Sequence, residues 1–284
     1  HVLLYFLMQL DSSLWPRQFK GIDQDKLQSK VTSYLTDIVR DISFNDGNFI
    51  VSNEGFFRSD EDAIGNCIDW FSEFFDDIEV LAFIRNPVDQ YSSSQQQVIK
   101  ANHYLESPDK FHYDFRKVVE NWRKLCSVSV IQFNKGSDSL ALLSEHIGIE
   151  THSMLTPERS NESLSIEQML LLEKIQSHLY SDYPNTFKNH LSLINGFKKG
   201  QHTSPKLKEE AIYSVINNHF EDLQWLKQFY GIDFGLNTPQ RPFDEYFPEE
   251  CKISDVYSID ASSYAVYESL IIDALLRDRA KKNN

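Results

Sequence analysis

The stretch from residue 78 to residue 93 reads IEVLAFIRNPVDQYSS and indicates the fold of the chain. Its first seven residues, Ile78–Ile84, form a nearly continuous apolar run, which is typical of a strand buried on both faces of a parallel sheet. Pro87 suits the first turn of a helix, so we expect a helix from about Pro87 to Ala101. A buried strand that leads directly into a helix is typical of a βαβ unit.

Segments on both sides continue this alternation of helices and strands. Apolar residues three to four positions apart predict helices, and short apolar runs predict strands. Ser59 is the expected N-cap of one helix, and Gly148 is expected to close another. The predicted elements are helices over Asp25–Ile42, 59–75, Lys110–Leu125 and Asp138–Ile147, and strands over Asn48–Val51 and Val128–Phe133.

This order of elements predicts an α/β fold with a parallel sheet. After Gly148 the strand signals stop, and the remaining pattern is helical apart from an irregular stretch over Gly231–Asp260. We therefore expect an α/β core over residues 1–150 and a helical extension over residues 151–284 that packs on it. The helices expected in the extension cover Ser165–Tyr180, Thr186–Phe197, Leu207–Asn217, Glu221–Tyr230 and Tyr264–Arg279.

The charge balance argues against nucleic acid as a partner. The 284 residues include 28 Lys and Arg against 42 Asp and Glu, a formal net charge of −14. Binding to phosphate backbones needs a basic surface, because cation contacts supply most of the affinity. The chain also lacks a run of about 18 uncharged apolar residues, so no membrane span is expected.

The cysteines and histidines do not indicate a metal site or a disulfide framework. Cys67, Cys126 and Cys251 are odd in number and far apart in the sequence, which fits buried thiols in a reducing compartment such as the cytoplasm. The nine histidines show no metal-ligand spacing, so no metal is expected.

Arg85 and Ser93 are candidate binding residues. In open α/β sheets, ligands bind beyond the carboxyl ends of the strands, where helix N-termini attract anions. Arg85 follows the strand directly, and Ser93 lies about two turns into the next helix, on a side that can face Arg85. A guanidinium and a hydroxyl together suit one phosphate. The alternative is that Arg85 pairs with a local carboxylate and Ser93 is an ordinary surface residue.

Glu54 and Arg159 are further candidates. Glu54 follows the strand expected over Asn48–Val51, so in a parallel sheet it would share an edge with Arg85. A carboxylate there can act as a general base toward a hydroxyl, or it can cap the neighbouring turn or helix. Arg159 belongs to a polar loop before the helix that Ser163 or Ser165 is expected to cap, and it is a candidate ligand residue.

Together these segments resemble bacterial sulfotransferases that use 3′-phosphoadenosine 5′-phosphosulfate (PAPS), in the branch related to carbohydrate sulfotransferases. The resemblance covers most of residues 1–230 and rests on short motifs in a common order. These are Ser52-x-Glu54-Gly55 after a strand, Arg85 and Ser93 eight residues apart, Gln97–Lys100 at a helix end, Asn161–Ser165 before a long helix, and Glu221–Leu226 before Tyr230-Gly231.

The resemblance implies a three-layer parallel sheet of the P-loop nucleotide-binding type, with a helical C-terminal extension. It implies transfer of a sulfuryl group from PAPS to a hydroxyl acceptor such as a carbohydrate, without a metal. Arg85 and Ser93 would bind the 3′-phosphate of PAPS, Glu54 would be the general base, and Arg159 would close over the nucleotide.

The chain departs from the family pattern in one respect. The glycine-rich loop with its catalytic Lys and Ser or Thr has no match, and it is expected before His1, so the chain is expected to begin after that loop. A degenerate, non-catalytic relative that binds a nucleotide or a glycan is the main alternative. A P-loop kinase and a scaffold protein are others.

Overall fold

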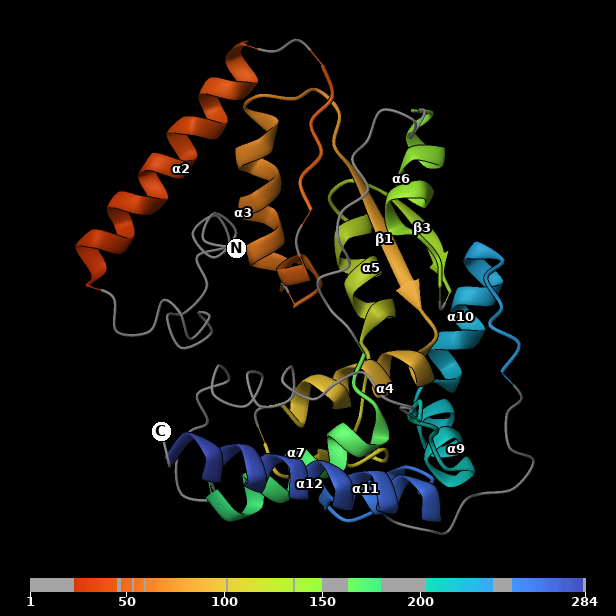
Figure 1. The fold of residues 1–284 in the computed structure, drawn as a ribbon. Helices are drawn as coiled ribbons and strands as arrows, with labels where there is room; N and C mark the ends of the chain where they lie inside the picture. Colours follow the sequence, from red (N-terminus) through yellow and green to blue (C-terminus); the bar gives the residue numbers. More distant parts are fainter. Residues whose placement is uncertain are drawn as a thin grey trace. The chain divides into compact units, whose positions relative to one another are not determined.

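A computed structural model gives the fold of the chain (Figure 1). It describes residues 23–44, 47–52, 54–58, 60–100, 102–134, 136–149, 163–179, 203–236 and 247–282. The chain forms two compact units that alternate along the sequence: unit 1 comprises His1–Ile84 and Asp114–Gln132, and unit 2 comprises Arg85–Tyr113 and Phe133–Asn284.

The core of unit 1 forms where two helices pack against a pair of parallel strands. Ile64 and Cys67 lie on the helix Glu61–Ser72 (α3) and are buried against Trp122, which lies on the helix Phe115–Arg123 (α5). Val80 and Val128, one from each strand, pack against the same cluster, so burial of apolar surface joins helices and strands. The elements are α2 (Gln24–Phe44), η3 (Glu54–Arg58), α3 (Glu61–Ser72), β1 (Glu79–Arg85), α5 (Phe115–Arg123) and β3 (Ser127–Phe133), with β1 paired to β3. The last residues of the two strands, Arg85 and Phe133, belong to unit 2.

Unit 2 is mainly helical. Its largest apolar cluster includes Tyr91, Met169, Val215 and Tyr257, all with no exposed surface. Two of its helices, α7 and α12, pack side by side (Figure 1). The elements are α4 (Pro87–Val98), β2 (Leu105–Glu106), α6 (Ser139–Ile147), α7 (Ile166–Leu179), α9 (Glu209–Asn218), α10 (Phe220–Tyr230), β4 (Glu250–Cys251), α11 (Ile253–Val256) and α12 (Ala261–Lys282).

Polar side chains of α4 form hydrogen bonds with the backbone of the short strand β2. The Tyr91 hydroxyl donates to the Glu106 carbonyl at 2.6 Å, and the Glu106 N–H donates to the side-chain oxygen of Gln95 at 2.8 Å. Gln95 is fully buried, so these bonds remove the cost of a buried amide. β2 pairs antiparallel with β4, with Leu105 opposite Cys251.

Helix ends follow the local sequence. The Asn86 side chain accepts from the Val88 N–H at 2.8 Å, and Pro87 occupies the first helical position of α4. Gly148 ends α6 in the left-handed conformation, with φ of 70°. Ser165 and Gln168 form a reciprocal cap at α7, in which each side chain accepts from the backbone N–H of the other residue.

Most predicted helices and two of the three predicted strands are confirmed, and the chain is a mixed α/β protein with a small parallel sheet. The three-layer P-loop sheet and the division at residue 150 stay predictions. The helix predicted over Thr186–Phe197 lies outside the described residues, as does Ser59. The helix predicted to start at Ser59 begins at Glu61 and is capped by Asp60, whose side chain accepts from the Ala63 N–H.

Three predictions are wrong. Residues Asn48–Val51 form no strand, and Phe49, Ile50 and Val51 are 38%, 54% and 44% exposed, so no apolar face is buried to fix a register. β1 is not buried on both faces, since Ile84 alone among its residues is fully buried. The predicted irregular region Gly231–Asp260 contains β4 and α11, which enter the core of unit 2.

Candidate site around Arg85

Arg85 is the last residue of β1 and is half-buried. The Cζ atom of its guanidinium lies 5.1 Å from the centroid of the Phe133 ring, and Phe133 is the last residue of β3. Within the described residues, no carboxylate oxygen lies within 4.0 Å of this guanidinium. The ring therefore supports the cation through a cation–π contact and leaves its N–H donors available.

Ser93 lies in the second turn of α4 and is also half-buried. Its hydroxyl makes no hydrogen bond to any residue that the structure describes. By contrast, the Ser94 hydroxyl accepts from the Gln95 side chain at 3.1 Å, and the Ser92 backbone carbonyl accepts from the Tyr257 hydroxyl at 3.5 Å. Arg85 and Ser93 thus belong to one strand–helix segment, and each retains donors for a ligand.

Tyr113 is a neighbour of Arg85 that the sequence did not indicate. Burial raises the pKa of the phenol to about 12, and the Arg85 backbone and guanidinium partly oppose that rise. Tyr113 therefore stays neutral at physiological pH and adds no negative charge beside the guanidinium.

The other two predicted site residues are Glu54 and Arg159. Glu54 is the first residue of η3 in unit 1, and its predicted position at the end of a strand is wrong because the described residues Asn48–Val51 form no strand. Arg159 lies outside the described residues. Their proposed roles as general base and nucleotide contact stay predictions.

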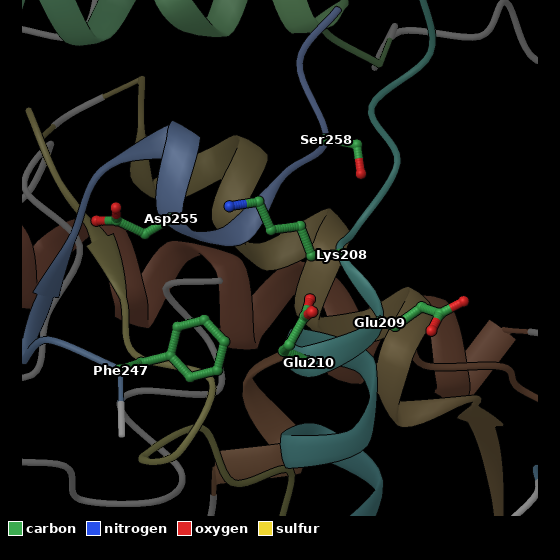
Figure 2. A pocket seen from close by; sticks show the side chains of 6 residues that line it. All are labelled: Lys208, Glu209, Glu210, Phe247, Asp255 and Ser258. Atoms are coloured by element: carbon green, nitrogen blue, oxygen red, sulfur yellow. The ribbon is translucent and has the colours of Figure 1, made fainter. Parts of the chain in front are cut away.

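A separate pocket of about 480 Å³ lies in unit 2 and contains none of the predicted site residues. It is lined by Lys208, Glu209, Glu210, Phe247, Asp255 and Ser258 (Figure 2). The Lys208 side chain extends toward α11, where its ammonium donates to the Ser254 carbonyl at 2.6 Å. This hydrogen bond occupies the Lys208 ammonium and ties the start of α9 to α11.

The thiols are free, as the sequence predicts. Burial raises the pKa of Cys67 to about 12 and that of Cys251 to about 11, with nearby Cys126 and Asp255 respectively adding to the rise. These two thiols are therefore protonated at physiological pH and behave as small apolar side chains.

Metal-ligand clusters and membrane-spanning helices are absent from the described part of the chain. There, no group of three or more His, Cys, Asp or Glu side chains is placed to hold a metal ion. Within the same residues, every helix is too short or too polar to cross a membrane.

Sequence reasoning missed the contact of Phe133 with Arg85 and the hydrogen bond that joins Tyr113 to His219. The sequence predicts Phe133 at the end of a strand, but its contact with Arg85 depends on how two strands pair. Tyr113 and His219 are joined by a hydrogen bond between residues 106 positions apart, for which a single sequence carries no local signal. Comparison with protein-family models, curated proteins and solved structures gives no significant match for this chain.

Proposed function

We propose that the chain is part of a PAPS-dependent sulfotransferase that transfers a sulfuryl group to a hydroxyl acceptor such as a carbohydrate. The observation that supports this proposal is the half-buried guanidinium of Arg85, which stacks on Phe133 without a carboxylate neighbour in the described residues. An arginine held in this way suits an anionic ligand, because its forked donors match phosphate oxygens. The order of the sequence motifs resembles that of PAPS-dependent sulfotransferases, and this resemblance is the reason to propose the 3′-phosphate of PAPS as the anion.

In this proposal Arg85 and Ser93 hold the 3′-phosphate of the nucleotide. A charge-assisted hydrogen bond contributes about 1.5–3 kcal/mol, which is enough to favour a 3′-phosphorylated nucleotide over an unmodified one by ten-fold or more. Arg159 would close over the nucleotide.

The transfer step follows in-line displacement. The acceptor oxygen forms a bond to sulfur while the bond between sulfur and the 5′-phosphate oxygen breaks, and Glu54 takes the acceptor proton. The products are a sulfate ester and adenosine 3′,5′-bisphosphate. The free thiols fit a cytoplasmic location.

The 3′-phosphate assignment is tested by calorimetry with two nucleotides, adenosine 3′,5′-bisphosphate and adenosine 5′-phosphate. The wild-type chain is expected to prefer the bisphosphate by at least about ten-fold. Arg85→Ala and Ser93→Ala are expected to reduce this preference, with the larger loss in Arg85→Ala. A matched control is Arg40→Ala, because Arg40 is exposed and pairs with Asp37 at 2.9 Å. An unchanged preference in Arg85→Ala contradicts the assignment.

The base assignment needs a separate measurement. A Glu54→Gln variant of the complete protein is expected to bind the bisphosphate normally and to lose most of its turnover. Wild-type turnover in that variant rejects Glu54 as the base. Nucleotide binding without transfer to any sugar hydroxyl would favour the alternative of a non-catalytic binding relative.

A further inference from the structure

Residues 107–113, here called the 107–113 segment, lie between β2 and α5 and are held to the end of α9 by hydrogen bonds. The side-chain nitrogen of Asn218, the last residue of α9, lies 2.9 Å from the carbonyl oxygens of both Pro108 and Asp109. At the corner between α9 and α10, the next residue, His219, accepts from the Tyr113 N–H at 2.7 Å. Two neighbouring side chains therefore hold the segment: an amide that cannot titrate and a histidine that can.

The hydrogen bonds of His219 define its protonation state. The residue has no exposed surface, and its Nδ1 atom lies 2.6 Å from the Val215 carbonyl oxygen. A carbonyl can only accept a hydrogen bond, and a backbone N–H can only donate one. The contacts with Val215 and Tyr113 therefore require the neutral tautomer, with its proton on Nδ1 and a lone pair on Nε2.

A second proton on His219 is incompatible with this arrangement. It would occupy Nε2, remove the acceptor of the Tyr113 N–H and place two donors against each other at a side chain without exposed surface. His219 must therefore leave its place to take up the proton, and Tyr113 loses its partner when it does.

His112 is a titratable neighbour that stacks on His219, with 5.0 Å between ring centroids and 14° between planes. Its side chain is 47% exposed, and its Nε2 atom lies 3.9 Å from an Asp222 carboxylate oxygen, so His112 can be protonated in place. A positive charge on His112 would oppose a second one on His219. The other titratable groups on the packed elements are Asp109, Lys110 and Tyr113 of the segment, Asp89 and Tyr91 of α4, Glu209, Glu210 and Tyr213 of α9, and Glu221, Asp222, Lys227 and Tyr230 of α10.

We propose that His219 is a pH-sensitive switch that holds the 107–113 segment to the corner between α9 and α10 when neutral and releases it on proton uptake. The proposal involves no ligand and does not depend on the proposed sulfotransferase function. A histidine in water has a pKa of about 6.5, so the released form binds a proton that the closed form excludes. Linkage then predicts that the released population rises about ten-fold between pH 8 and pH 5.5.

The first test is amide hydrogen exchange of the full chain, measured by NMR from pH 8 to pH 5.5 and corrected for intrinsic exchange rates. The Tyr113 amide is expected to lose about ten-fold in protection over this range. The matched control is the Glu106 amide, because it donates at 2.8 Å to the Gln95 side chain, an acceptor that does not titrate. The Glu106 amide is expected to keep its protection. Constant protection of Tyr113, or equal losses at both amides, overturns the proposed local release.

The second test uses variants to identify the titrating group. His219→Gln can keep an acceptor for the Tyr113 N–H but cannot titrate, so protection of that amide is expected to stay within about two-fold from pH 8 to pH 5.5. His112→Gln leaves His219 in place and is expected to retain the loss of protection. The control His146→Gln, which replaces an exposed histidine of α6, is expected to retain it as well.

The outcomes distinguish His219 from its stacked neighbour. A wild-type loss of protection in His219→Gln, or no loss in His112→Gln, shows that His219 is not the switch. Should His219→Gln fail to fold, the ring ¹⁵N shifts of the wild-type chain at pH 7.5 still test the proposal. They are expected to show a protonated Nδ1 and an unprotonated Nε2 in His219, and a proton on Nε2 overturns it.

Discussion

The guanidinium of Arg85 rests on the ring of Phe133, with 5.1 Å between Cζ and the ring centroid. Each residue is the last of its strand, so the pairing of β1 with β3 brings the two side chains together. The ring stabilises the cation and accepts no hydrogen bond from it that would compete with a phosphate.

Replacement of Phe133 tests this support. Phe133→Leu keeps an apolar side chain but removes the π face, so the affinity for adenosine 3′,5′-bisphosphate is expected to fall about two- to five-fold, as for a cation–π contact of about 0.5–1 kcal/mol. In an Arg85→Ala background the same change is expected to have no further effect, which calorimetry on the four variants measures. Equal losses in both backgrounds would show that Phe133 acts independently of Arg85.

Loss of the cap at Asp60 is expected to destabilise unit 1. Its side chain accepts from the Ala63 N–H at 2.9 Å, so Asp60→Ala should lower the free energy of unfolding by about 1 kcal/mol in urea titrations. Asp62→Ala is the control, because Asp62 has the same charge in the first turn of the same helix and is not the cap. Equal losses in the two variants would attribute the effect to charge near the helix N-terminus.

Asp109 joins two distant segments of unit 2. One carboxylate oxygen accepts from the Ser214 hydroxyl, and the other accepts from the Phe247 N–H at 2.7 Å. Asp109→Ala leaves both donors without this acceptor and should cost about 2–3 kcal/mol in the free energy of unfolding. Asp89→Ala, which removes a half-buried carboxylate of α4, should cost less than about 1 kcal/mol. A small loss in Asp109→Ala would show that water replaces the carboxylate.

Two glutamates of α7 are expected to affect stability with opposite dependence on pH. Burial alone would raise the pKa of Glu167, but hydrogen bonds from Thr203 and Ser165 bring it below its ordinary value. Burial raises the pKa of Glu173 above its ordinary value, despite a hydrogen bond from the Ile253 N–H at 2.7 Å. The ionised form is therefore favoured by folding at Glu167 and disfavoured at Glu173.

The pH dependence of each contribution to stability follows from the difference between the folded and the unfolded pKa of the glutamate. Glu167 contributes stability above its unfolded pKa, near 4.5, and this contribution is lost as the pH falls through its lower folded pKa. Glu173 destabilises the fold above its raised pKa, and acidification through that pKa relieves the effect. In unfolding titrations between pH 7 and pH 3, Glu167→Gln should flatten the acid loss of stability, and Glu173→Gln should steepen it. The same change of slope in both variants would contradict the assigned directions.

The native thiols are expected to react slowly with iodoacetamide at pH 8. Cys67 and Cys251 are buried and have raised pKa values, and burial also raises the pKa of the half-buried Cys126. Peptide mass spectrometry over time should show Cys126 labelled first, with all three labelled rapidly in urea. Rapid native labelling of Cys67 would show that α3 opens readily from its partners.

Local signals predicted the helices well. Pro87 placed the start of α4, and Gly148 placed the end of α6, because each residue acts through its own backbone geometry. The strand expected over Asn48–Val51 failed because an apolar run does not by itself supply a neighbouring strand. The prediction of an irregular region over Gly231–Asp260 failed because β4 forms by pairing with β2, which lies far away in the sequence.

The candidate site was predictable only in part. The position of Arg85 after a strand follows from the sequence, and the structure adds its stacking on Phe133. The hydrogen bond from the Tyr113 N–H to His219 spans 106 positions, which local patterns do not encode. The joint arrangement of Arg85 with Glu54 stays a prediction.

The alternation of the two units along the chain has a consequence for synthesis on the ribosome. The last segment of unit 1 ends at Gln132, whereas the Asp109 carboxylate of unit 2 awaits a Phe247 amide 138 positions later. At typical elongation rates this delay is on the order of ten seconds, far longer than helix formation. The last residue of unit 1 is therefore synthesised well before Phe247 can complete the contacts of Asp109 in unit 2.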